Sequence, residues 1–136
     1  MEIMFKDYVI TDSKQRMQLD VITELLRDTY WAKKWSIETI KMAMDNSICF
    51  GVFLQNKQIA YARCVTDYST MYWLCDVVVD KKYRHNGIGN MLVKTITNYN
   101  ILSPLMGILS SNHSKELYMK YGFKLSTNGF MIKSTH

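Results

Sequence analysis

The residues from Arg84 to Gly89 read Arg-His-Asn-Gly-Ile-Gly and have the composition of an anion-binding loop. They follow the apolar run 72–79 and precede a segment, 87–98, whose apolar residues recur at helical spacing. Glycines let the main chain approach a ligand closely, and the first N–H groups of a helix carry partial positive charge without an internal partner. Arg84 adds a guanidinium fork beside them. The order strand, glycine loop, helix therefore predicts a phosphate site.

The spacing of this loop excludes two well-known phosphate loops. A P-loop needs Lys and then Ser or Thr after its last glycine, whereas Asn90 and Met91 follow Gly89. A dinucleotide-binding loop needs a third small residue, and Leu92 stands in that position. The remaining pattern is Arg-x-x-Gly-x-Gly after a strand, which by itself also fits a tight turn before an ordinary amphipathic helix.

A second segment, 114–123, predicts a short helix that stops at a glycine. Ser114 is a plausible N-cap, and Gly122 suits the left-handed position that follows a helix. Leu117 and Tyr121 are four residues apart and are expected to share a core face. The apolar run 105–109 predicts a strand before this helix.

Together these two motifs resemble the Gcn5-related N-acetyltransferase family, and the resemblance extends over most of the chain. That family binds acetyl-CoA through a [Gln/Arg]-x-x-Gly-x-[Gly/Ala] loop and carries a Leu-Tyr-x-x-x-Gly-Phe segment after its fifth strand. The resemblance implies acetyl-CoA as co-substrate, held by loop residues Arg84, His85, Asn86, Gly87, Ile88 and Gly89 and by strand residues Val77, Val78 and Val79. Many members place an Asn seven residues before the helix tyrosine. Here Ser111 has that position, so Asn112 is the candidate for the contact with CoA and Ser111 the alternative.

The activity that the resemblance implies is direct transfer of an acetyl group from acetyl-CoA to a primary amine in a ternary complex. It places Tyr118 near the CoA sulfur. A free tyrosine has a pKa of about 10 and donates a proton near neutral pH, so Tyr118 is the candidate acid. The alternative is an aromatic side chain packed between helix and sheet.

Asp76 is the candidate base, because it interrupts an apolar strand where a charge is costly unless it is used or paired. Strand alternation places it on one face with Leu74 and Val78. The alternative is that Asp76 is a structural aspartate held by hydrogen bonds. A chain of ordered water molecules could also replace Tyr118 as the acid or Asp76 as the base.

The amine that accepts the acetyl group is expected to bind near Tyr30, Trp31 and Asp67, because the corresponding region of family members borders the acceptor cleft. An aromatic wall with a carboxylate suits a cationic amine. The alternative is that these aromatic side chains belong to the core. The amine itself stays open among polyamine, amino acid, aminoglycoside and protein N-terminus.

The elements that position these residues predict a single domain over 1–136 of the α/β class, with a mixed α+β sheet flanked by helices on both faces, as in the fold that the resemblance implies. The expected strands are 8–11, 48–54, 59–66, 71–79, 105–109, 123–126 and 129–133, and the expected helices are 13–27, 36–45, 87–98 and 114–121. The strands 71–79 and 105–109 are expected to be parallel, joined by a right-handed crossover through helix 87–98.

Composition agrees with a cytoplasmic enzyme. The net charge of +5 suits an anionic ligand such as CoA, and the scattered lysines give no nucleic-acid motif. The three cysteines lack metal-ligand spacing, so no metal is expected. No segment predicts a membrane span or a signal peptide. A homodimer is possible. The rival functions are a non-catalytic acyl-CoA sensor on the same fold and a basic nucleic-acid-binding module.

Overall fold

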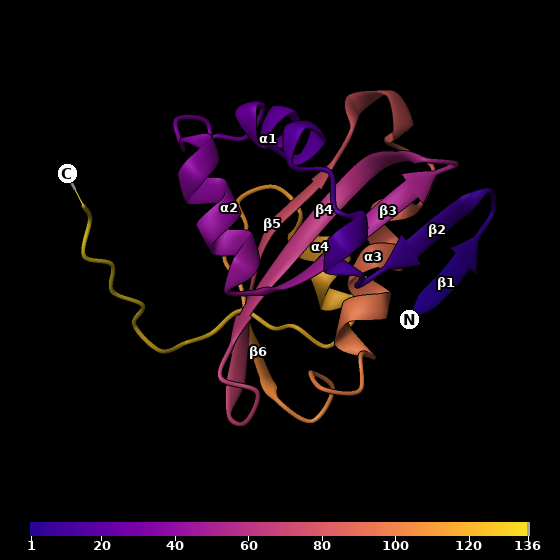
Figure 1. The fold of residues 1–136 in the computed structure, drawn as a ribbon. Coiled ribbons are helices and arrows are strands. Elements are labelled where there is room, and N and C mark those ends of the chain that lie inside the picture. Colours follow the sequence, from indigo (N-terminus) through magenta and orange to yellow (C-terminus); the bar gives the residue numbers. More distant parts are fainter. Residues whose placement is uncertain (136) are drawn as a thin grey trace.

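The centre of the computed structural model, which describes residues 1–135, is a six-stranded sheet (Figure 1). Its strands are β1 (Glu2–Phe5), β2 (Tyr8–Thr11), β3 (Ile48–Leu54), β4 (Lys57–Thr66), β5 (Met71–Val79) and β6 (Met106–Ile108). They lie side by side in chain order. All neighbours are antiparallel except β5 and β6, which are parallel. The expected mixed sheet is confirmed.

Helices cover both faces of this sheet (Figure 1). They are α1 (Leu19–Arg27), α2 (Ile37–Asp45), α3 (Ile88–Thr97) and α4 (Lys115–Met119), with 3-10 turns η1 (Lys14–Arg16) and η2 (Lys81–Tyr83). The helices α1 and α2 pack on one face, and α3 packs on the other. None of the helices described is long and apolar enough to cross a membrane.

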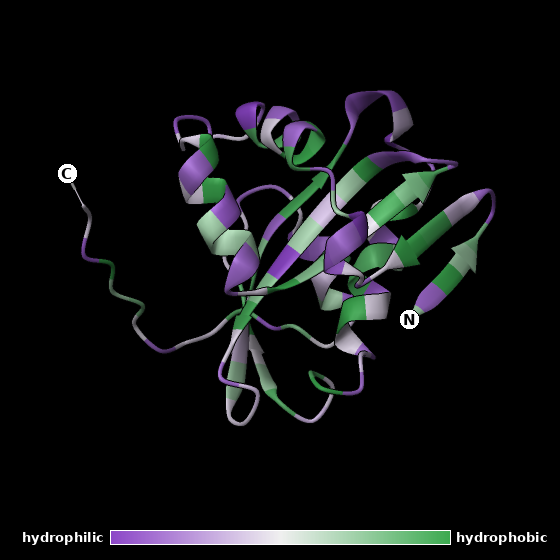
Figure 2. Cartoon of the chain, viewed as in Figure 1, coloured by the Kyte–Doolittle hydropathy of each residue, from purple (hydrophilic) through white to green (hydrophobic). Residues whose placement is uncertain are grey.

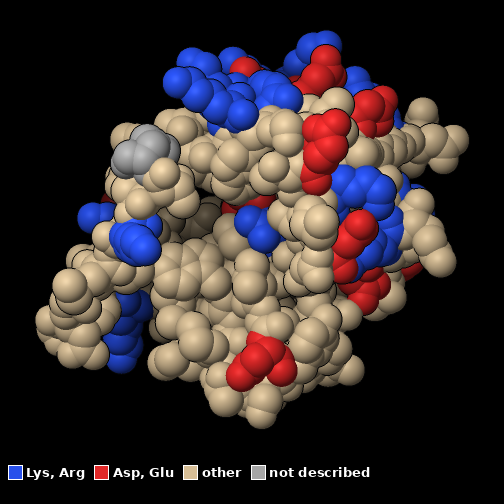
Figure 3. Space-filling view, turned by 60° about the vertical axis from the view of Figure 1, so that its left-hand side comes forward, with Lys and Arg blue, Asp and Glu red and all other residues tan. Residues whose placement is uncertain are grey.

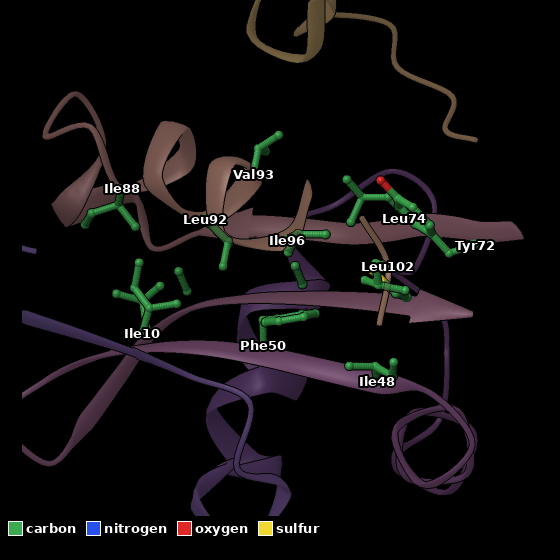
Figure 4. Close-up of a cluster of buried hydrophobic side chains, with 14 of the residues drawn as sticks. Ile10, Ile48, Phe50, Tyr72, Leu74, Ile88, Leu92, Val93, Ile96 and Leu102 are labelled. Atoms are coloured by element: carbon green, nitrogen blue, oxygen red, sulfur yellow. The ribbon is translucent and has the colours of Figure 1, made fainter. Parts of the chain in front are cut away.

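Two buried cores result, one on each face, and Figure 2 shows the apolar residues along the central strands that separate them. On the α3 side, Ile88, Leu92 and Ile96 stand four residues apart on one helix face and point toward strand residues such as Phe50 (Figure 4). On the other side, residues of α1 and α2 pack against Tyr61 and other strand residues. Residues of β3, β4 and β5 contribute to both cores.

Local sequence explains where α2 begins and where α4 ends, whereas Ser114 stands at the N-cap position of α4 without a side-chain capping bond. The Ser36 side chain accepts a hydrogen bond from the Thr39 N–H at 3.1 Å and caps α2, as expected. After α4, Gly122 has φ of 96°. Its N–H and that of Phe123 donate to the carbonyls of Met119 and Tyr118, which is a Schellman motif. This motif sets the end of the helix that carries Tyr118.

The expected helix 13–27 is divided into η1 and α1. Gln18 has an extended backbone between them, with φ of −103°. Its main-chain N–H donates to the Gln58 side chain at 2.8 Å, and its own side-chain oxygen accepts from the Gln58 N–H at 3.1 Å. These bonds tie the segment to β4, and this pairing between distant residues overrides the local helical pattern.

The expected strands 123–126 and 129–133 are wrong. Residues 123–135 form neither helix nor strand, and the segment runs away from the sheet (Figure 1). Alternating apolar residues make a strand only where a neighbouring strand completes the ladder of hydrogen bonds. Here Leu125 is 70% exposed and Ile132 is 76% exposed. The ring contact of Phe130 with Trp73, at 5.5 Å between centroids, ties the segment to β5.

Candidate active site

The strands β5 and β6 pair over a short length and then separate. Residues 71–73 pair with 106–108, whereas the rest of β5 has no partner on this side. The chain after β6 continues as the loop 109–114. Two cavities lie along the edge of β5 that this separation opens.

The first, the α3 cavity, has a volume of about 580 Å³. It lies between the C-terminal end of β5, the N-terminus of α3 and α4. Nearly all residues expected to hold the cofactor line it: Val77, Val78, Val79, Arg84, His85, Gly87, Ile88 and Gly89. The structure thus brings the glycine loop and the strand residues to one cavity.

The backbone of the loop presents donors to this cavity. Gly87 has φ of 82° and is the N-cap of α3, with no side chain capping the helix. The first turn of α3 contains no acidic residue, so its N–H groups and partial positive charge are not neutralised locally. Arg84 folds back, and its Nε donates to the Val79 carbonyl at 3.0 Å. This arrangement is suited to a phosphate group.

Asn86 does not line the α3 cavity, contrary to expectation. Its side-chain amide donates to the Tyr83 carbonyl at 3.0 Å and to the Arg84 carbonyl at 3.3 Å. Its own carbonyl accepts from Lys6 at 2.9 Å. The exposed Asn86 side chain bonds the backbone of its own loop, so its role is to shape the loop.

The second, the aromatic cavity, has a volume of about 350 Å³ and lies between β5 and the loop 109–114. Tyr30 and Trp31, from the segment after α1, form one side. Their rings meet edge to face, with centroids 5.1 Å apart. Trp73 and Asp76 of β5 also line it. The structure thus places the two expected aromatic residues, Tyr30 and Trp31, at one cavity.

The two cavities adjoin. Both are lined by the same small group of residues, which are Tyr30, Trp31, Val77, His113, Ser114 and Tyr118. A ligand lying along β5 in the α3 cavity would therefore present its end to the aromatic cavity at Val77 and Tyr118.

A β-bulge lies at this junction. Arg63 of β4 pairs with Cys75, and Tyr61 with Val78, so Asp76 and Val77 both oppose Ala62 alone. Asp76 has φ of 57°, a left-handed conformation that costs a non-glycine residue about 1 to 3 kcal/mol and is concentrated at functional sites. A bulge removes backbone groups from the ladder, which frees them for a ligand.

The bulge also reverses the alternation of β5. Leu74 belongs to the core under α3, whereas Val78 belongs to the core under α1 and α2. The expectation that Asp76 shares a face with both residues is therefore wrong for Leu74, because the extra residue shifts the period-two pattern by one position.

The Asp76 carboxylate is buried, with 4% of the residue exposed, and both of its oxygens are engaged. Arg63 Nε donates to Oδ2 at 2.7 Å, and Trp31 Nε1 donates to Oδ1 at 2.8 Å. Burial disfavours the charged form of Arg63, but Asp76 together with Cys75 and Tyr61 outweighs this effect, so the pKa of Arg63 is raised. Asp76 thus lies in the cavity as expected, already partnered. Its role as a base stays a prediction.

Tyr118 is buried, with 9% exposure, and lines both cavities. Its ring meets Phe123 edge to face, at 6.1 Å between centroids. Burial raises the pKa of Tyr118, so the phenol keeps its proton at neutral pH. A proton donor must be protonated, and the Tyr118 phenol is. The same side chain also packs in the core, which is the role that the alternative gave it.

Asn112 is expected to contact the cofactor, but it lies at the aromatic cavity instead. Its side-chain amide donates to the Tyr30 hydroxyl at 3.1 Å. It lines the aromatic cavity together with Ser111, and neither lines the α3 cavity. The bond joins the segment after α1 to the loop after β6 across the cavity, and so fixes the Tyr30 ring.

Asp67 is not brought to either cavity, contrary to expectation. It lies in the turn between β4 and β5, where its carboxylate accepts from the N–H groups of Ser69 and Thr70 at 2.9 and 2.8 Å. These bonds, with one from the Thr70 hydroxyl at 2.6 Å, lower the pKa of Asp67 well below its usual value. The residue shapes the turn.

Sequence reasoning missed Arg63 and Trp73. Arg63 interrupts the apolar strand β4 as Asp76 interrupts β5, and opposite charges within adjacent buried strands indicate a pair. Trp73 lies within the expected strand 71–79, and no sequence pattern distinguishes a cavity wall from a core position.

The comparisons with known proteins agree with this geometry. Residues 45–125 match the family described as an acetyltransferase (GNAT) domain. A putative acetyltransferase of the GNAT family from Xanthomonas campestris pv. campestris is 30% identical, with a TM-score of 0.85 over 88% of this chain and 86% of that chain. Among curated proteins none matches the sequence.

More distant structures share the fold. A probable acetyltransferase from meticillin-resistant Staphylococcus aureus is 19% identical, with a TM-score of 0.76 over 93% of this chain and 99% of that chain. An aminoglycoside 6'-N-acetyltransferase complexed with coenzyme A is also 19% identical, with a TM-score of 0.73 over 86% of this chain and 85% of that chain. With its divergent β5 and β6, its glycine loop before α3 and these matches, the chain belongs to the GNAT acetyltransferase family.

Proposed function

We propose that this protein transfers an acetyl group from acetyl-CoA to a primary amine. The observation that carries the proposal is the junction of the two cavities, where Val77 and Tyr118 line both. A cofactor in the α3 cavity and an amine in the aromatic cavity would meet there. Holding both reactants in contact is itself worth several kcal/mol of the barrier.

The α3 cavity suits the cofactor. The free N–H groups of α3, the left-handed Gly87 and the Arg84 guanidinium would hold the pyrophosphate. The unpaired edge of β5 over 77–79 would run beside the pantetheine arm. The structural neighbour that is complexed with coenzyme A has the same fold, which supports this assignment.

The transfer forms a bond between the amine nitrogen and the acetyl carbon and breaks the bond between that carbon and the CoA sulfur. The backbone at the Asp76–Val77 bulge would donate to the oxyanion of the tetrahedral intermediate. Tyr118 would give its proton to the leaving thiolate. The ammonium loses one proton to solvent through the open aromatic cavity before it attacks. The second proton, lost from the nitrogen of the tetrahedral intermediate, replaces the one that Tyr118 has given to the thiolate.

Asp76 acts in this scheme as a positioning residue. Its carboxylate holds the Trp31 indole on one side and Arg63 on the other. Because both of its oxygens already accept a hydrogen bond, the carboxylate links the bulge to the cavity wall.

Transfer is direct and does not pass through an acetyl-cysteine. Cys75 is the cysteine that lines the aromatic cavity. Burial, opposed in part by Arg63, raises the pKa of its thiol to about 11. The nucleophilic thiolate is therefore scarce at neutral pH.

The test is release of free thiol from acetyl-CoA on a panel of primary amines, with initial rates measured while both substrates are varied. Intersecting rate patterns and amine-dependent thiol release are expected. Tight acetyl-CoA binding without turnover of any amine would favour the alternative, an acyl-CoA sensor. Salt-dependent binding of oligonucleotides without CoA binding would favour a nucleic-acid-binding module.

A further inference from the structure

The aromatic cavity carries no free negative charge. Among the described residues that line it, Asp76 is the carboxylate, and Arg63 and Trp31 occupy its two oxygens at 2.7 and 2.8 Å. The Asp76 side chain is 2% exposed and that of Arg63 is 12% exposed. Because the two charges are opposite and adjacent, a cation entering the cavity meets a neutral pair.

The adjoining α3 cavity offers no substitute. Its wall, within the described part of the chain, contains one carboxylate, Asp28, whose oxygen lies 3.7 Å from Lys81 Nζ. Lys and Arg outnumber Asp and Glu by five over the whole sequence. Figure 3 shows basic side chains at the upper edge of the face it presents, with acidic side chains among them and on its right-hand side. An amine with several positive charges therefore finds few counter-charges near the site.

Apart from Asp76, the walls of the aromatic cavity combine apolar side chains with the Ser, Asn and His side chains of residues 110–114. The Trp31 indole donates to Asp76 and the Asn112 amide donates to the Tyr30 hydroxyl, so each ring has a hydrogen-bond partner in the cavity wall. Trp73 and Leu109 add apolar surface. Aromatic faces accept a hydrocarbon chain, another ring or a single ammonium group, but a second ammonium finds no unpaired carboxylate among the described residues that line the cavity.

We infer that the acceptor is a monoamine whose amino group stands on an uncharged aliphatic or aromatic body, and that polyamines and aminoglycosides are discriminated against. This inference rests on the proposed acetyl transfer. It replaces the expectation of an aromatic wall with a carboxylate for a cationic amine, because Asp67 lines neither cavity and Arg63 neutralises Asp76.

The test compares hexylamine with hexamethylenediamine, which have the same carbon chain and differ by one ammonium group. The expected kcat/KM for hexylamine exceeds that for the diamine by about tenfold or more, after the factor of two for its two equivalent amines. An equal or higher kcat/KM for the diamine would overturn the inference while leaving acetyl transfer intact.

A charge-adding variant tests the cause. Asn112→Asp keeps the size of an exposed side chain that lines the cavity, and its carboxylate can accept a hydrogen bond from the Tyr30 hydroxyl. The preference for hexylamine should fall severalfold in Asn112→Asp but not in the uncharged control Asn112→Ser. An unchanged preference in Asn112→Asp would contradict the assigned role of cavity charge.

A binding measurement separates this inference from the proposed function. If neither amine releases thiol, acetyl transfer to such amines is refuted, and binding of both amines to the complex with CoA is followed by tryptophan fluorescence. Tighter binding of hexylamine than of the diamine would support the inferred preference of the aromatic cavity for monoamines even without transfer. Equal or tighter binding of the diamine overturns it.

Discussion

Arg63 Nε lies 2.7 Å from Asp76 Oδ2, and this ion pair joins the middle of β4 to the bulge of β5. Asp76 also accepts from Trp31, so one carboxylate connects the sheet to the wall of the aromatic cavity. The pair therefore has two consequences. It stabilises the strained backbone at the junction of the cavities, and it removes a free negative charge from the acceptor side.

Removing the arginine should destabilise the fold. Arg63→Met leaves a buried carboxylate without its partner, a change that costs about 3 to 5 kcal/mol in the free energy of unfolding. Urea denaturation measures it. Arg63→Lys is the matched control and should lose less, since it keeps the charge but not the guanidinium bond to Ser47. A loss below about 1 kcal/mol for Arg63→Met would show that the pair is not important for stability.

Asp76→Asn distinguishes a positioning residue from a base. We expect kcat/KM to fall about tenfold at every pH, with the shape of the pH profile kept, because Asn still accepts from Trp31 but loses the ion pair. The measurement is the pH dependence of kcat/KM in both proteins. Loss of the acid limb of the profile in Asp76→Asn alone would instead identify Asp76 as the base.

Much of this site was predictable from the sequence because its main signals are local. The glycine loop, the strand before it and the stop of α4 at Gly122 each depend on a few adjacent residues, and the structure confirms all three. The hairpin of β3 and β4 follows from equally local turn and alternation signals.

The rest depends on contacts between distant residues, which one sequence does not reveal. The extra residue at Asp76 reverses the alternation of β5, and nothing in the apolar run 72–79 marks it. Asn112 faces Tyr30 because the loop after β6 crosses the cavity. The strands expected over 123–133 have the right alternation but no neighbouring strand to pair with.

Tyr118→Phe tests the proton donor. Loss of the hydroxyl should lower kcat by about ten- to a hundredfold with little change in the KM for acetyl-CoA. Because the pKa of Tyr118 is raised, its proton is present through neutral pH and is lost only as pH rises beyond its usual value of about 10, so no Tyr118-dependent decline is expected below that point.

The control for this experiment is Tyr121→Phe. Tyr121 follows α4, and its hydroxyl donates to the Asn90 side chain at 3.2 Å without lining either cavity. Its kcat should stay near that of the unchanged protein. An unaltered kcat in Tyr118→Phe across the pH range would remove Tyr118 as the acid.

Arg84 should contribute to cofactor affinity. Arg84→Gln removes a guanidinium beside the helix N-terminus and should raise the Kd of acetyl-CoA about tenfold, as loss of a charged hydrogen-bonding partner does. Lys82→Gln is the matched control, because Lys82 lies on η2 outside the cavity. Calorimetric titration measures both. Equal increases in the Kd of acetyl-CoA in the two variants would show that Arg84 acts only through the net charge of the protein.

Cys75 should be dispensable for chemistry. With a pKa of about 11, about one thiol in a thousand is ionised at pH 8, so Cys75→Ser should retain transfer within about threefold. Mass spectrometry after mixing with acetyl-CoA alone should show no acetylated protein. A stable acetyl adduct on Cys75, lost on adding amine, would indicate a two-step mechanism.

The most direct test of the central claim follows the acetyl group itself. Acetyl-CoA labelled with carbon-13 at its carbonyl is mixed with the protein and hexylamine, and NMR records the carbonyl resonance. We predict that the thioester signal is replaced by an amide signal as an equal amount of free CoA thiol appears. A persistent thioester signal with acetyl-CoA bound, or conversion to acetate alone, would contradict acetyl transfer to an amine.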